Sequence, residues 1–230
     1  PQDGFPRARA PAERAIALDP DIPDAHVSIS LERLFWARDW PGAEREMKRA
    51  IELNPKLALA HSFYGLILVT SGRFDEALAE ARLASELHPL SLVINMGVAW
   101  VHHFSGNHGA AAEEARRTRE LAPNFEEAGN ILIASYELLG RLEEAAALIS
   151  EQPYFGVPLD GAQLLAAYRE GGAAAYWRKR LQLLEALEGT SPMVLFPLAI
   201  VNGMIGNKDR AIDYLERMVD LNIGAVVFMS

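Results

Sequence analysis

The chain has 230 residues, 50% of them hydrophobic, and carries a formal net charge of −9. An acidic chain lacks the basic stripe that a phosphate backbone requires, so we expect no nucleic-acid binding. The sequence contains no cysteine, which excludes disulfides and thiolate metal sites and fits a cytoplasmic location. No apolar run approaches the ~18 residues of a spanning helix, so we expect no membrane segment.

The chain begins Pro1-Gln2-Asp3 rather than with a methionine, which predicts a piece of a longer protein. The first predicted element runs from Arg7 to Leu18 and reads as a single helix, with Pro11 setting or interrupting its start. It ends in Leu18-Asp19-Pro20, and endings of the form Leu-x-Pro recur along the chain at nearly constant spacing. The later ones close at Pro55, Pro89 and Pro123, and the first interval is one position longer than the other two.

Other small residues keep the same period. Alanines recur at a constant interval, at Ala43, Ala77, Ala111 and Ala145. A period of about 34 residues indicates a stack of similar small units rather than one globular core. A stacked array of this kind functions mainly through its surface.

One unit, 58–91, shows the predicted local structure. Apolar residues at helical spacing fill its first half, and Ser71-Gly72-Arg73 then breaks the pattern. A second amphipathic run follows until Pro89, whose ring cannot continue a helix. Each unit is therefore predicted to be a first helix, a tight turn, a second helix and a loop marked by proline.

The whole chain is predicted to form one array of such units. We expect a degenerate unit at 158–191, because Gly171-Gly172 is its one clear turn and Trp177 occupies a position where a small residue is expected. The predicted segments are a partial repeat at 1–23, repeats at 24–57, 58–91, 92–125 and 126–157, the degenerate repeat at 158–191, a repeat at 192–223, and the start of a truncated element at 224–230.

The second unit resembles the tetratricopeptide repeat family. That family has two small residues, an alanine and a proline at fixed positions, which are here Gly65, Ala77, Ala84 and Pro89. The first unit departs from the pattern with Leu31 at the first small position. The resemblance implies an all-α fold, a right-handed α-solenoid of antiparallel helix pairs that acts as a non-catalytic scaffold for a protein or peptide partner.

A narrower resemblance concerns a subgroup of that family. The runs Trp40–Glu46 and Gly206–Ala211 are similar to the repeat region that bacterial signalling proteins carry after a winged-helix, cyclase or kinase domain. This implies that the chain belongs to a larger bacterial regulator. Nothing in the sequence resembles the effector domain itself.

The family resemblance also implies a partner-binding groove, lined by the first helix of each unit. The positions that map to it are mostly aromatic or aliphatic, which favours a peptide held by apolar anchors. The alternative is that several of these side chains only pack helix against helix. The Lys, Asn and Arg residues of the carboxylate clamp in chaperone-binding relatives are missing. The candidate groove residues are Phe35, Trp36, Leu66, Met96, Trp100, His103, Phe104 and Asn130.

Signals for chemistry are weak. None of the six histidines belongs to a metal-binding motif, and no phosphate-binding or dinucleotide-binding loop occurs, so we expect no metal, no cofactor and no enzyme activity. The one dense basic cluster, Arg178-Lys179-Arg180, is expected on a solvated outer face.

Two other functions remain open at this stage. One is sensing of a small ligand by Trp100, His103 and Asn130, coupled to an attached effector domain. The other is homo-oligomerisation, because the apolar end Gly224–Met229 has no capping unit after it and could form a homodimer through terminal repeats.

Overall fold

The structure is a computed structural model that describes residues 4–221 and 223. The described residues form helices, turns and loops, with one isolated β-bridge between Tyr154 and Val157. They fall into two compact units, of which unit 1 ends at Asn107 and unit 2 begins at His108. The predicted all-α class of fold, built from antiparallel helix pairs as in an α-solenoid, is confirmed. The end Gly224–Met229, on which the predicted homodimer depends, lies outside the described residues.

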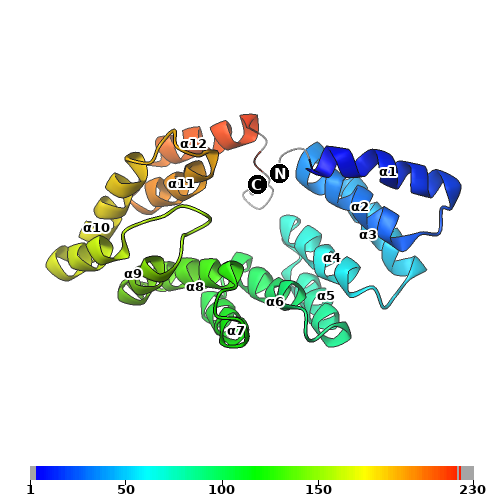
Figure 1. The fold of residues 1–230 in the computed structure, drawn as a ribbon, viewed down its shortest axis with the longest axis horizontal. Coiled ribbons are helices and arrows are strands. Elements are labelled where there is room, and N and C mark those ends of the chain that lie inside the picture. Colours follow the sequence, from blue (N-terminus) through cyan, green and yellow to red (C-terminus); the bar gives the residue numbers. More distant parts are fainter. Residues whose placement is uncertain (1–3, 222, 224–230) are drawn as a thin grey trace. The chain divides into compact units, whose positions relative to one another are not determined.

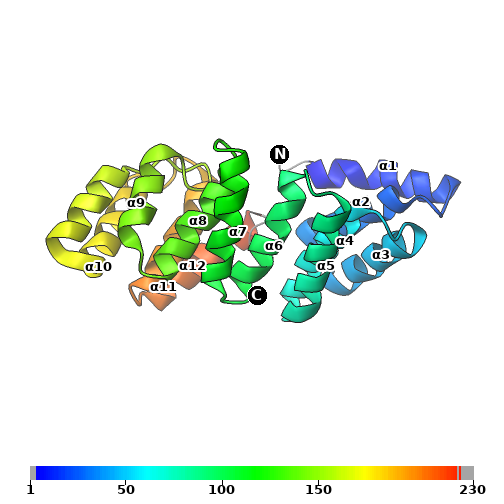
Figure 2. The same ribbon diagram turned by 90° about the horizontal axis from the view of Figure 1, so that it is seen from below.

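The described part of unit 1 contains six α-helices, and a π-helical turn continues the second of them. Figure 1 shows α2 with α3 and α4 with α5 as antiparallel pairs, and in Figure 2 α4, α5 and α6 lie side by side. The elements are α1 (Gly4–Leu18), α2 (Pro23–Glu32), the π-helical turn (Arg33–Ala37), α3 (Trp40–Leu53), α4 (Ala58–Thr70), α5 (Phe74–Leu87) and α6 (Leu92–Phe104).

Six further α-helices lie among the described residues of unit 2. The longest, α10, is two helices in one, because Gly171 (φ −145°) and Gly172 (φ 64°) interrupt it at the turn that the sequence predicts. A short 3₁₀ turn, Pro192–Val194, precedes α11. The helices are α7 (His108–Leu121), α8 (Glu126–Leu138), α9 (Leu142–Glu151), α10 (Gly161–Glu185), α11 (Leu195–Met204) and α12 (Lys208–Asp220).

The turn between paired helices needs a residue with left-handed backbone. Glycine adopts this conformation without a steric cost, and such residues recur once per repeat in the first four turns. They are Arg38 (φ 54°), Gly72 (φ 69°), Gly106 (φ 79°) and Gly140 (φ 73°). The first turn thus has an arginine where the others have glycine.

The π-helical turn absorbs the extra residue of the first repeat. The stretch from Pro20 to Arg38 is one position longer than the equivalent stretch from Pro55 to Gly72, so the insertion lies within or beside the first helix of that repeat. The π-helical turn Arg33–Ala37 lies at this place, with Asp39 N–H donating to Arg33 O (2.9 Å). A π-helix accommodates one extra residue in a turn, which keeps the flanking α-helical segments in register with the next repeat.

This insertion changes which residue is the small one. In the second repeat, a Cβ on Gly65 would lie 3.0 Å from Ala77 O, so the helices approach closely there. The equivalent residue in the first repeat is the fully buried Ser30, whose hydroxyl donates to Ala43 O (2.7 Å). The placement of Leu31 at this position was wrong, because the alignment lacked the inserted residue.

Replacing a glycine by alanine is expected to change the stability of unit 2 in opposite directions at two positions, Gly140 and Gly109. Gly140→Ala is expected to destabilise unit 2 by about 1–2 kcal/mol, since its left-handed backbone disfavours a Cβ. Gly109→Ala, in the first turn of α7 with nothing within 4 Å of a new Cβ, is expected to stabilise it by about 0.4–1 kcal/mol. Urea denaturation of both variants measures the difference. Shifts of the same sign would contradict the backbone explanation.

Candidate functional site

The first helices of the repeats in unit 1 carry the candidate residues on an unusually uncharged background. Helices α4 and α6 contain no Asp, Glu, Lys or Arg at all. Such composition is typical of buried helices, yet several large side chains on these helices and in the π-helical turn are only partly covered. We call Trp36, Leu66, Trp100, His103 and Phe104 the aromatic surface.

The aromatic surface has two parts. At the end of the π-helical turn, 37% of the Trp36 surface is exposed. On α6, Trp100 stacks on Phe104, with ring centroids 5.6 Å apart and an interplanar angle of 14°. The His103 ring lies edge-on to both rings, 6.4 Å from Trp100 and 5.5 Å from Phe104. The three rings thus form one half-buried cluster.

The core beneath the surface explains its position. Phe35 and Phe104 both pack against the buried cluster that α2 to α6 form in unit 1. Met96, on α6, is 2% exposed. These contacts favour helix packing as the role of Phe35 and Met96, whereas Trp36 and Trp100 keep surface that a partner could cover.

Asn130 is a candidate of a different kind, because it lies on α8 in unit 2 and is 7% exposed. Its Oδ1 accepts a hydrogen bond from the backbone N–H of Phe155, with N and O 2.9 Å apart. The side-chain oxygen of Asn130 is therefore already hydrogen-bonded within the chain. It also belongs to a different compact unit from Trp100 and His103, with which the sequence had grouped it.

A charge network ties neighbouring helices of unit 1 together. Arg73, the residue before α5, donates to Glu44 on α3 (2.8 Å) and to Glu76 in the first turn of α5 (2.6 Å). Hydrogen bonds from Lys48 and Arg73 hold the pKa of the Glu44 carboxyl below its usual range. This network connects α3 with α5 and also reaches α4, where the Tyr64 hydroxyl donates to Glu44 Oε1 (3.2 Å).

Comparisons with known proteins agree with this architecture. Residues 58–82 match the family described as Tetratricopeptide repeat. The matched stretch comprises α4 and the first part of α5, which is one helix pair of this architecture. No curated protein matches the sequence.

Several solved structures share the tetratricopeptide-repeat fold. The chain superimposes on a chain of the APC/C hetero-tetramer Cut9–Hcn1 at 13% identity with a TM-score of 0.62, over 99% of this chain and 46% of that one. PilW, a type IV pilus biogenesis factor, is 19% identical with a TM-score of 0.59, over 94% of this chain and 86% of that one. A tetratricopeptide repeat protein from Parabacteroides merdae ATCC 43184 is 18% identical with a TM-score of 0.56, over 86% of this chain and 79% of that one. At these identities the likeness shows the fold alone.

A buried ionic cluster lies between α8, α10 and the loop that precedes α10. Arg180 is fully buried, forms an ion pair with Glu137 of α8, and lies over the ring of Tyr154, 4.8 Å from its centroid. Tyr176 donates to Glu137 (2.6 Å). Burial raises the pKa of both tyrosines and lowers that of Arg180 to about 9. We call these four residues, with Trp177, the buried ionic cluster.

The prediction for the basic run was therefore wrong for one residue. Arg178 is exposed as expected, but Arg180 points into unit 2 instead of into solvent. Trp177, 8% exposed, was the available signal, because a large ring at a position for a small residue indicates a repeat packed in another way. Because a charged residue is normally expected in solvent, the sequence did not indicate that Arg180 pairs with Glu137, which belongs to the preceding repeat.

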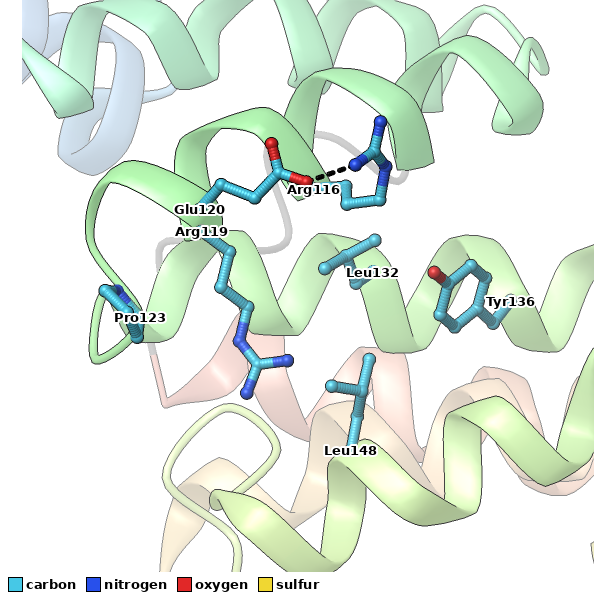
Figure 3. Close-up of a pocket in the computed structure, with 7 residues that line it drawn as sticks. All are labelled: Arg116, Arg119, Glu120, Pro123, Leu132, Tyr136 and Leu148. Atoms are coloured by element: carbon cyan, nitrogen blue, oxygen red, sulfur yellow. Dashed lines mark hydrogen bonds and ion pairs between the residues drawn. The ribbon is translucent and has the colours of Figure 1, made fainter.

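A hollow of about 300 Å³ lies in unit 2 between α7, α8 and α9. Figure 3 shows the side chains that line it. Both of its arginines are already paired, Arg116 with Glu120 and Arg119 with Glu151. The floor is apolar. The two ion pairs leave the hollow without a surplus of positive charge, so nothing favours a particular ligand. The lining residues are Arg116, Arg119, Glu120, Pro123, Leu132, Tyr136 and Leu148.

Metal and membrane sites were also considered. Within residues 4–221 and 223, no three histidine or carboxylate side chains come close enough to share a metal ion. None of the described helices is both long and apolar enough to cross a bilayer.

Proposed function

We propose that the chain is a non-catalytic scaffold that binds a protein or peptide segment through the aromatic surface of unit 1. The observation that supports this most is the combination of uncharged helices, α4 and α6, with incompletely covered aromatic rings. Soluble proteins rarely leave such rings on an uncharged face unless a partner covers them. Trp is also the residue most often found to dominate the energy of an interface.

The chemistry of the surface defines the partner. A segment with aliphatic or aromatic anchors three to four residues apart, as on one face of a helix, would bury Trp36 and Trp100. An acidic peptide is not favoured, since no lysine or arginine lies on α4 or α6. Placement within a larger bacterial signalling protein, and in the cytoplasm, remains a prediction from the sequence and from the narrower resemblance.

A peptide array followed by fluorescence anisotropy with the tightest binder tests the proposal. Trp36→Ala and Trp100→Ala are each expected to weaken binding by about tenfold or more, as hot-spot tryptophans do. Far-UV circular dichroism should stay unchanged. Trp40→Ala is a matched control, because Trp40 is also 37% exposed but begins α3 and lies outside the aromatic surface. Equal loss in all three variants, or no loss in any, would contradict the proposal.

A further inference from the structure

Helix α1 of unit 1 carries an open, largely apolar hollow of about 410 Å³. All of the residues that line it belong to α1, which packs with its other side against α2 and the π-helical turn (Figure 1). Ala15 in the hollow is partly exposed, whereas Ala50 and Ala84, at the same repeat position in α3 and α5, are fully buried. This side of α1 therefore lacks the cover that the later second helices have. The lining residues are Ala10, Pro11, Arg14, Ala15 and Leu18.

The later repeats show that a helix covers the equivalent side. At the same distance before the closing proline, α3 and α5 carry Glu46 and Glu80, and each binds a histidine on the first helix of its own pair. In α1 this position is Pro11, whose side chain forms no hydrogen bond. The hollow on α1 is thus suited to a helix, but not to one that presents the histidine of these first helices.

The charge in the hollow favours an acidic helix. Arg14 is the charged member of the lining, is exposed, and forms no ion pair within the described part of the chain. The neighbouring Arg9 is already paired, with Glu13 and Glu32. A helix that covers Leu18, which is 82% exposed, also covers Arg14, and a covered charge is costly unless a carboxylate faces it.

Helix α12 of unit 2 has a face with this chemistry. Ile212 is 52% exposed, and Leu215, one turn further along, is partly buried. The two arginines of α12 are paired with Glu185 and Glu188, so they do not neutralise its outer face. Beside Ile212 runs a row of exposed carboxylates, three or four residues apart and so on one side of the helix: Asp209, Asp213, Glu216 and Asp220.

We propose that the hollow on α1 binds α12 of a second copy of this chain. Ile212 and Leu215 of one copy cover Ala15 and Leu18 of the other, and the carboxylate row faces Arg14. The contact joins two different surfaces, so each copy can use both of them and association continues beyond a dimer unless a ring closes. The aromatic surface of unit 1 takes no part in this contact.

Sedimentation velocity of the whole chain tests the proposal. The weight-average mass is expected to rise between about 10 and about 500 µM, since a contact of one helix face per copy is small and therefore weak. Leu18→Asp and Ile212→Asp should each raise the concentration of half-association by about tenfold or more, because each buries an unpaired charge. Leu121→Asp is the matched control, since Leu121 is 77% exposed and also stands in a Leu-x-Pro ending, but belongs to α7.

Mixing the two variants tests whether the contact joins different surfaces. The Leu18→Asp chain keeps an intact α12, and the Ile212→Asp chain keeps an intact α1. An equimolar mixture should therefore form a one-to-one pair about tenfold more readily than either variant alone. Far-UV circular dichroism checks the fold of each variant. Arg14→Glu replaces Leu18→Asp, and Glu216→Lys replaces Ile212→Asp, where a variant does not fold.

The proposal is overturned if the mass of the unchanged chain does not depend on concentration, as it would not if α12 met α1 within one chain. It is equally overturned if either folded variant associates as the unchanged chain does, because contacts of α1 with α1 or of α12 with α12 would survive one of the two substitutions. A mixture that associates no better than its components also overturns it. None of these results depends on whether the aromatic surface binds a partner.

Discussion

Glu137→Ala is expected to lower the free energy of unfolding of unit 2 by about 3–5 kcal/mol, because it leaves the Arg180 charge buried without its partner. Arg180 is fully buried and Glu137 is 4% exposed, so water cannot replace the lost carboxylate. Burial lowers the pKa of Arg180 to about 9, which is still above neutral pH, so the guanidinium remains charged at pH 7. Urea denaturation followed by far-UV circular dichroism measures the loss.

A double substitution separates the charge from the packing. Glu137→Leu with Arg180→Met removes both charges and keeps similar volumes, so its stability should lie within about 1 kcal/mol of the unchanged chain or exceed it. Tyr176→Phe, which removes only the hydroxyl that donates to Glu137, should cost about 1 kcal/mol. A double variant as unstable as Glu137→Ala would mean that packing, rather than the unpaired charge, explains the loss.

His61→Ala is expected to destabilise unit 1 by about 2 kcal/mol, through the loss of two buried hydrogen bonds. His61 is 4% exposed, and its Nδ1 faces Glu80 Oε2 at 2.6 Å while its Nε2 faces Pro55 O at 3.0 Å. Both ring nitrogens therefore lie within hydrogen-bond distance of an oxygen atom. The His61 side chain thus connects the loop at Pro55, which closes one repeat, to Glu80 on α5, the second helix of the next pair.

The chain itself supplies the matched control for His61. In three consecutive repeats, a side chain in the first turn of the next helix pair binds the carbonyl oxygen of the closing proline. The bonds are His26 Nε2 to Pro20 O (3.0 Å), His61 Nε2 to Pro55 O (3.0 Å) and Asn95 Nδ2 to Pro89 O (2.8 Å). His61→Asn should therefore retain the bond to the loop and lose only the contact with Glu80.

The expected loss for His61→Asn is about 1 kcal/mol, between the unchanged chain and His61→Ala. Urea denaturation of the three proteins at pH 7 gives the order. If His61→Asn is no more stable than His61→Ala, the carbonyl bond contributes nothing and the explanation is wrong.

Much of the helical architecture was predictable from the sequence because it depends on local rules. Proline ends a helix, and glycine with left-handed backbone turns it, wherever they stand. The prediction of the Gly171-Gly172 turn is an example, since it needs no knowledge of what packs nearby. The π-helical turn was less accessible. The longer first interval, from Pro20 to Pro55, indicated one extra residue, but it did not show where in the repeat that residue lies.

The candidate surface was predictable only in part. The family resemblance placed Trp36 and Trp100 on first helices, and the structure leaves both partly exposed. It also placed Met96 and Asn130 there, but one is packed into unit 1 and the other binds Phe155. Positions in a repeat define which way a side chain points, whereas neighbouring segments decide whether it stays uncovered.

The sequence by itself determined the repeat period and the helix pairs with their glycine turns, since these follow from steric rules that act within one repeat. Only the tertiary structure decided that Arg180 meets Glu137 and that Phe155 contacts Asn130 of α8 and Phe196 of α11. The reason is physical. Burial and pairing depend on side chains from different repeats, and no spacing within one repeat specifies which of them will meet.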